Sequence, residues 1–168
     1  MDNQIKIAVD AMGGENSPFK VIKGIEIHNK NSNGIFYNIF GDKNQISPIL
    51  KKIKLSEDSF KLFHTDEQIQ DEDSPLSAAK KGKNTSMWLS IESLKKNESD
   101  AIVSAGNTGV LLVISRMILK MMNEVSKPAL AGLWPNKKGM NVVLDLGANI
   151  ECDENNLVDF AELGSALY

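Results

Sequence analysis

The chain has 168 residues, 42% of them hydrophobic and 24% charged, which is typical of a globular chain long enough to bury a core. Its formal net charge of −3 lacks the basic excess of a general nucleic-acid binder, so no nucleic-acid partner is expected. The single cysteine, Cys152, excludes an internal disulfide and favours a reducing, cytoplasmic location.

Short apolar runs alternate with helical patterns along the chain, which predicts an α/β fold. In chain order we expect a strand at 5–10, a helix at 18–29, a strand at 35–40, a helix at 45–53, a strand at 60–64, a helical region at 74–96 broken near Gly82, a strand at 101–104, a helix at 107–123, strands at 129–133 and 142–146, and a helix at 154–167. No repeat or linker divides these elements, so a single domain over residues 1–168 is expected. Helices between consecutive strands imply a mostly parallel sheet, whose ligands bind beyond the carboxyl ends of the strands.

One glycine-rich loop joins a predicted strand directly to the strongest predicted helix. This loop reads Ser104-Ala105-Gly106-Asn107-Thr108-Gly109. Glycines let backbone N–H groups approach a ligand closely, and the start of a helix attracts anions. The sequence therefore predicts phosphate binding by Ser104, Gly106, Asn107, Thr108 and Gly109, while the alternative is that Asn107 or Thr108 only caps the helix.

Two further loops place a carboxylate where a predicted strand ends. Asp10 begins the loop "DAMGGE", which includes Gly13 and Gly14, and Asp145 begins "DLGAN", which includes Asn149. If the two strands are neighbours, the carboxylates could act as acid and base or hold a metal, but capping of turn donors is the favoured interpretation for each. The glycines are expected to supply positive φ or close backbone approach.

The basic patch at Lys80, Lys81 and Lys83 suits either an anionic partner or simple solvation. An acidic run, "DEQIQDED", lies just before it. No Cys/His spacing predicts a zinc site, and no metal is expected. The acidic neighbours of Cys152 disfavour a thiolate, and no nucleophile-elbow motif is present. A reaction in which the substrate brings its own nucleophile, such as inorganic phosphate, is favoured.

At these loops the chain resembles the amino-terminal half of the bacterial phosphate acyltransferases of phospholipid synthesis, the PlsX family. The matching segments occur in family order: "IAVDAMGGENSP", "GDK", "SPLSAAKKGKNTSM", "DAIVSAGNTG", "KPALAGLWP" and "LDLGANIECDENNLVDFAELGSALY". The resemblance implies a three-layer α/β/α fold like that of phosphotransacetylases and isopropylmalate dehydrogenases. It also implies transfer of a fatty acyl group from acyl carrier protein to inorganic phosphate, giving an acyl phosphate.

The resemblance further implies a homodimer, peripheral contact with the inner face of the membrane, and no organic cofactor. On this interpretation Asp10, Asn107, Asp145 and Asn149 are catalytic. Gly13 and Gly14 join the phosphate loop, and Lys80, Lys81 and Lys83 contact the carrier protein. Family members are about twice as long, so the chain is expected to be the amino-terminal half of a longer chain. Two alternatives stay open: a soluble phosphotransacetylase using acyl-coenzyme A, and a non-catalytic module that binds carrier protein or a partner chain.

Overall fold

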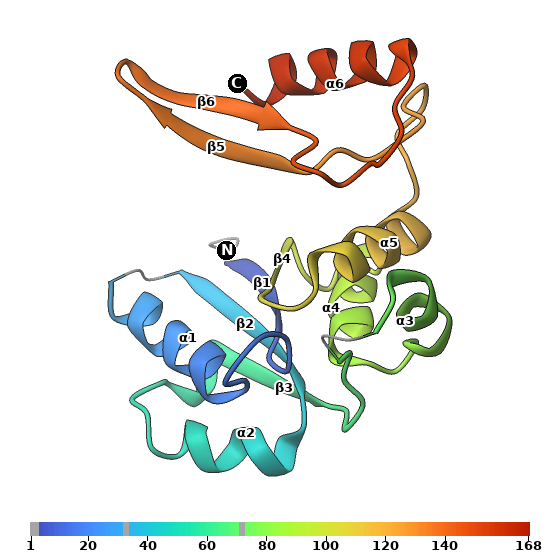
Figure 1. The fold of residues 1–168 in the computed structure, drawn as a ribbon. Coiled ribbons are helices and arrows are strands. Elements are labelled where there is room, and N and C mark those ends of the chain that lie inside the picture. The colour runs from blue at the N-terminus through green and yellow to red at the C-terminus, as the bar shows by residue number, and fades with distance from the viewer. Residues whose placement is uncertain (1–3, 32–33, 71–72) are drawn as a thin grey trace. The chain divides into compact units, whose positions relative to one another are not determined.

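The computed structural model describes residues 4–31, 34–70 and 73–168 (Figure 1). It divides into two compact units, Met1–Leu119 and Lys120–Tyr168. Organisation of all 168 residues as a single domain stays a prediction, and each unit is taken separately here.

The first unit is built around a four-stranded parallel sheet. Its strands lie in the order β3 (Phe60–His64), β2 (Ile35–Gly41), β1 (Ile5–Asp10) and β4 (Ala101–Ser104). The connecting helices are α1 (Phe19–Asn31), α2 (Lys43–Leu50), α3 (Pro75–Lys81), α4 (Ser86–Lys95) and α5 (Thr108–Leu119), and a short 3-10 helix covers Glu57–Ser59. All four strand predictions in this unit are confirmed to within one residue, as is the helix break near Gly82.

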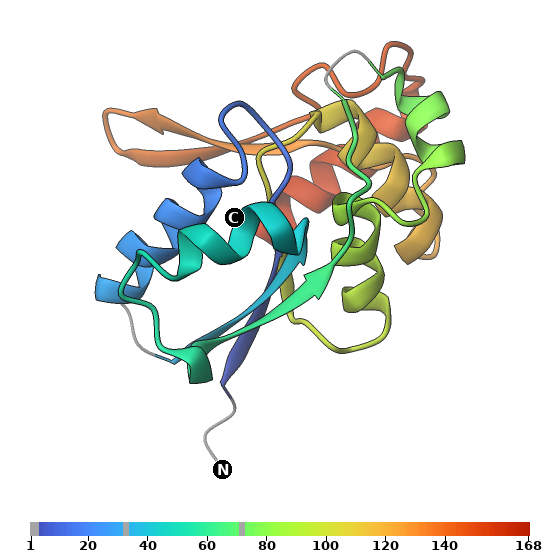
Figure 2. The same ribbon diagram turned by 90° about the horizontal axis from the view of Figure 1, so that it is seen from below.

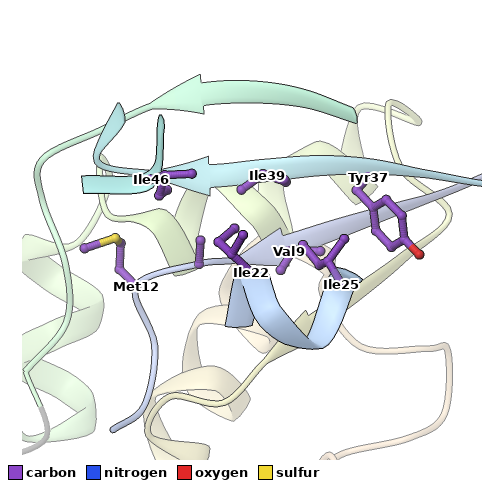
Figure 3. Close-up of a cluster of buried hydrophobic side chains, with 8 residues drawn as sticks. Val9, Met12, Ile22, Ile25, Tyr37, Ile39 and Ile46 are labelled. Carbon is purple, nitrogen blue, oxygen red and sulfur yellow. The ribbon is translucent and has the colours of Figure 1, made fainter. Parts of the chain in front are cut away.

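Helices cover both faces of this sheet, as the two views show (Figures 1 and 2). On one face α1 and α2 pack on β1 and β2 through a buried cluster (Figure 3) that contains Val9, Ala11, Met12, Ile22, Ile25, Tyr37, Ile39 and Ile46. On the other face a second cluster joins α3, α4 and α5, and it contains Ala78, Ala79, Met87, Ile91, Val110, Ile114 and Ile118. The expected three-layer α/β/α arrangement with a parallel sheet is therefore confirmed.

Capping residues set the helix boundaries that the periodicity left approximate. Asp42 caps α2 by accepting a hydrogen bond from the Asn44 amide, so the helix begins two residues earlier than predicted and includes Pro48. Ser74 caps α3 ahead of Pro75, at the start of the predicted helical region. Helix α5 ends at Leu119 rather than at 123, because Lys120 adopts a left-handed φ of 67°.

The second unit contains a β-hairpin and one helix. Strands β5 (Ala131–Asn136) and β6 (Gly139–Leu144) pair antiparallel and precede α6 (Glu154–Leu167). These two strands do not join the parallel sheet of the first unit. Only Lys137 and Lys138 separate them, whereas a parallel connection needs a crossover of about a dozen residues. Asp153 and Asn156 form a capping box that fixes the predicted start of α6.

Candidate functional site

Three of the glycine- and aspartate-rich loops leave the same edge of the parallel sheet. The strand register places Asp10 beside Phe40 and Ser104, and Gly41 beside His64. The loops after β1, β2 and β4 therefore start together, as predicted. The loop "DLGAN" follows β6, which pairs with β5 in a separate hairpin, so Asp10 and Asp145 do not end neighbouring strands.

Asp10 is the buried centre of this edge, with a side chain only 1% exposed. One carboxylate oxygen accepts hydrogen bonds from the Ser86 hydroxyl (2.6 Å) and the Met12 amide (3.3 Å). The other oxygen accepts from the Ser104 hydroxyl at 2.7 Å. The Ser104 oxygen in turn accepts from the Gly106 amide at 3.1 Å. Asp10 thus ties the start of α4 to the loop that leads into α5.

The two glycines after Asp10 let the loops after β1 and β4 touch through their backbones. A Cβ on Gly13 would lie 2.6 Å from an Asp10 carboxylate oxygen and 2.8 Å from the Gly106 nitrogen. Gly14 has a φ of +86°, and a Cβ there would lie 2.5 Å from the Ala105 carbonyl oxygen. Positive φ and close backbone approach, the two roles expected of these glycines, are both present.

The loop after β4 delivers its polar residues to the first turn of α5. The Asn107 side-chain oxygen accepts a hydrogen bond from the Val110 amide at 3.1 Å, so the capping interpretation of Asn107 holds. Thr108 is the first residue of the helix and is exposed. Gly109 has a packing role, since a Cβ there would lie 3.1 Å from the Pro75 ring of α3. The start of α5 nevertheless keeps the partial positive charge that favours an anion.

The acidic residue of the loop after β2, Asp42, caps helix α2. Both oxygens of the Asp42 carboxylate accept hydrogen bonds, from the Gln45 side chain and the Asn44 amide, each at 2.8 Å. These bonds, the Gln45 bond foremost, hold the pKa of Asp42 below its usual range. Asp42 therefore stays ionised as the cap of α2.

Asp145 and Asn149 form a closed turn within the second unit. Asp145 has a φ of 55°, and one of its oxygens accepts hydrogen bonds from the Asn149 amide (3.2 Å) and side chain (2.8 Å). The Asn149 side chain also donates to the Pro128 carbonyl at 2.8 Å. The Cys152 thiol lies 3.8 Å from the other Asp145 oxygen. A catalytic role for Asp145 or Asn149 stays a prediction.

The basic patch lies around the connection between α3 and α4. Lys80 and Lys83 are exposed, whereas the side chain of Lys81 lies outside the described part of the structure. The same connection is anchored by Thr85, which caps α4, and by Thr65, whose hydroxyl donates to the Asn84 carbonyl at 2.5 Å. The patch therefore lies next to α4, whose first residue, Ser86, donates a hydrogen bond to Asp10.

Ser86 is the residue of this site that the sequence did not single out. It is 2% exposed and donates to a carboxylate 76 positions away, a contact that no local pattern reveals. The only sequence signal is its place just after the helix cap Thr85. Among the described residues, no group of three or more His, Cys, Asp or Glu side chains is arranged to hold a metal ion. No described helix combines the length and apolar character that a membrane span requires.

Comparison with known proteins identifies the family of the chain. The profile of the family "Fatty acid synthesis protein" matches residues 5–168. The chain belongs to this family. Its relatives include the phosphate acyltransferase of Pelagibacter ubique, 56% identical over the whole chain, and that of Paramagnetospirillum magneticum, 38% identical over 98% of the chain. The resemblance to phosphate acyltransferases is therefore confirmed.

The family match covers only part of the longer relatives. The chain spans 50% of the Pelagibacter ubique protein and 47% of the Paramagnetospirillum magneticum protein. Among solved structures, the EutD phosphotransacetylase from Staphylococcus aureus aligns with a TM-score of 0.62 at 18% identity, over 95% of this chain and 51% of its own. At this identity the likeness supports the fold alone, and it agrees with the three-layer architecture.

Proposed function

We propose that the chain contributes one wall of a site that transfers a fatty acyl group from acyl carrier protein to inorganic phosphate. A phosphate oxygen forms the new bond to the thioester carbonyl carbon, the carbon–sulfur bond breaks, and the leaving thiolate takes a proton. The products are an acyl phosphate and the free carrier thiol. Because phosphate is itself the nucleophile, this reaction needs no serine or cysteine acyl-enzyme.

One observation carries the proposal. In a chain related throughout to phosphate acyltransferases, the Ser104–Gly109 loop runs from the edge of a parallel sheet straight into α5. Such an edge is where α/β sheets bind ligands, and a helix start favours phosphate. Catalysis on this scheme rests on holding two anionic reactants together and on donors that face the developing oxyanion.

Within this proposal the buried carboxylate has a positioning role. Both oxygens of Asp10 already accept hydrogen bonds from serine hydroxyls, and the side chain is almost fully buried. Asp10 would therefore act through Ser104, which it orients, while Asn107 and Thr108 would face phosphate. Asp145 and Asn149 would contribute from the second unit.

Partner contacts complete the proposal. Exposed Lys80 and Lys83, with Lys81, would attract the acidic carrier protein. A homodimer and peripheral membrane contact are proposed for the longer protein of the family.

The proposal is tested first by phosphate binding to the 168-residue chain, measured by calorimetry with inorganic phosphate. Asn107→Ala and Thr108→Ala should each raise the dissociation constant roughly tenfold or more, since hydrogen bonds to a charged group are lost. Ser59→Ala, which removes a turn hydroxyl outside this edge of the sheet, is the matched control and should bind as the parent does. Equal phosphate affinity in all variants would show that the phosphate placement is wrong.

Turnover is tested with the same variants. Phosphate-dependent consumption of acyl-carrier thioester is compared with consumption of acyl-coenzyme A, and preference for the carrier thioester is expected. Preference for acyl-coenzyme A would favour a phosphotransacetylase. Saturable carrier binding without turnover would favour a binding module.

A further inference from the structure

Asp10 is a buried carboxylate that no cation balances. Among the described residues, no lysine, arginine or histidine side chain forms an ion pair with it. A buried charge without a cation is costly unless hydrogen bonds stabilise it. Its donors are the Met12 amide and the hydroxyls of Ser86 and Ser104. These three donors therefore decide how the carboxylate is held.

The two serine hydroxyls bind different oxygens of this carboxylate. Ser86 donates to one oxygen at 2.6 Å, and Ser104 donates to the other at 2.7 Å. The remaining donor on the Ser86 side is the Met12 amide, at a longer 3.3 Å. The terminal torsion of an aspartate is broad, so bonds to both oxygens are what restrict its rotation. Without the Ser86 hydroxyl, the carboxylate of Asp10 would be free to turn.

Ser104 transmits this constraint to the loop after β4. A serine hydroxyl has one proton, and Ser104 gives that proton to Asp10. The Ser104 oxygen accepts a hydrogen bond from the Gly106 amide at 3.1 Å, so a turn of the carboxylate would shift the hydroxyl and then the backbone at Gly106. Gly106 directly precedes Asn107 and Thr108, where α5 begins. The orientation of the carboxylate therefore influences how the loop enters the helix.

Helix α4 does not need the Ser86 hydroxyl for its own cap. Thr85 caps the helix by accepting a hydrogen bond from the Trp88 amide, and this leaves the Ser86 hydroxyl to bind Asp10. Ser90 lies one turn further along α4 and is also fully buried. Its hydroxyl donates to the Ser86 carbonyl of the same helix at 2.7 Å. The two serines therefore share their residue type, helix and burial, and they differ in whether the hydroxyl reaches Asp10.

We propose that Ser86 is a positioning residue for phosphate binding, and that it acts through Asp10 and Ser104 without touching the ligand. The inference rests on the proposed function, in which inorganic phosphate binds where the loop at 104–109 enters α5. The hydrogen bond from Ser86 keeps the carboxylate in the orientation that fixes Ser104 and Gly106. The donors that follow in the loop are then held in one arrangement before the anion arrives, which is how supporting residues improve a binding site.

Hydrogen exchange of the Gly106 amide, followed by NMR, measures this positioning without any ligand. Ser104→Ala removes the acceptor of that amide and gives the exchange rate of the unconstrained loop. Ser86→Ala should raise the rate about fivefold or more over the parent, towards the Ser104→Ala value. Ser86→Cys keeps a weaker donor and should give a rate between those of the parent and Ser86→Ala. Ser90→Ala is the matched control and should leave the Gly106 rate unchanged.

Calorimetry with inorganic phosphate shows whether the positioning matters for binding. Ser86→Ala should raise the dissociation constant about fivefold or more, and Ser90→Ala should leave it unchanged. In a chain that already carries Ser104→Ala, adding Ser86→Ala should change the dissociation constant by less than about twofold, because the connection to the loop is already broken. A residue that only stabilised the fold would weaken phosphate binding equally in both backgrounds.

Three results would overturn the proposal. The first is a Gly106 exchange rate in Ser86→Ala that equals the parent rate. The second is identical behaviour of the Ser86→Ala and Ser90→Ala variants, and the third is full additivity of Ser86→Ala and Ser104→Ala in phosphate affinity. If the parent chain bound no phosphate, the proposed function would fail, while the Gly106 exchange rates would still decide whether Ser86 positions the loop.

Discussion

Gly13 lies where the loops after β1 and β4 touch, and this contact is possible because glycine has no Cβ atom. A methyl group there would overlap both the Asp10 carboxylate and the Gly106 nitrogen. We expect Gly13→Ala to lower the free energy of unfolding by about 1–3 kcal/mol, because one loop must move and the Asp10 network must loosen. The measurement is urea unfolding followed by circular dichroism.

Gly24→Ala provides the matched control for this substitution. The new methyl group meets no heavy atom within 4 Å, and the position is helical, so stability should rise by about 0.5–1 kcal/mol. Opposite signs for two identical substitutions would identify close loop contact as the cause. If Gly13→Ala were as well tolerated as Gly24→Ala, the contact between the loops after β1 and β4 would not exist in solution.

The sequence anticipated the residues of this site whose role is local. Gly13 and Gly14 are predicted to supply positive φ or close approach, and capping by Asn107 or Thr108 is the alternative to phosphate binding, because turn and cap chemistry depends on adjacent residues. It did not reveal Ser86, because the hydrogen bond from Ser86 to Asp10 forms only once α4 packs on the sheet. Nor did it reveal that Gly109 packs closely against the Pro75 ring of α3.

At the level of elements, α1 contains an acidic residue that is held between two lysines. Glu26 is 5% exposed and forms ion pairs with Lys23 and, at 3.1 Å, with Lys30. The hydrogen bond from Lys23, followed by that from Lys30, lowers the pKa of Glu26 from 4.5 to about 2. Since the folded-state pKa is below that of the unfolded chain, Glu26 contributes stability above about pH 4.5 and loses that contribution as the pH falls towards 2.

Glu26→Gln should therefore remove part of the acid sensitivity of folding. Urea unfolding at pH 5.5 and pH 3, values about one pH unit on either side of the ordinary carboxyl pKa, is expected to show a smaller loss of stability in the variant than in the parent. Glu57→Gln removes the same charge from an exposed 3-10 helix and corrects for the change in net charge. Equal pH dependence in the two variants would show that the ion pairs of Glu26 do not persist in solution.

Element types were predicted well where one periodicity dominates, as in β1, β3, β4 and α6. The hairpin was misjudged for a physical reason. The short apolar runs at 129–133 and 142–146 indicate strands without indicating their partners. The short strands before them, which are separated by helices, favoured a parallel sheet. The signal available in the sequence was that only eight residues, 134–141, separate the two predicted strands, fewer than a parallel crossover needs.

The two units of the chain differ in how many hydrophobic side chains they bury. The first contains two clusters of buried hydrophobic residues on either face of its sheet. In the second, Asn156 and Phe160 are the buried residues, while Leu133, Trp134 and Leu157 are each more than half exposed. Since stability comes chiefly from buried apolar area, the hairpin and α6 should open more readily than the parallel sheet.

Hydrogen exchange of the intact chain measures this difference directly. Amide hydrogens of β1 and β2 are expected to exchange at least about tenfold more slowly than those of β5 and β6, a difference in opening free energy of about 1.4 kcal/mol or more. Phe160→Ala sharpens the test. It removes the one buried aromatic side chain of the second unit, so it should accelerate exchange in β6 and α6 while β1 and β2 keep their rates. Acceleration of all strands together would mean that the two units open as one cooperative body.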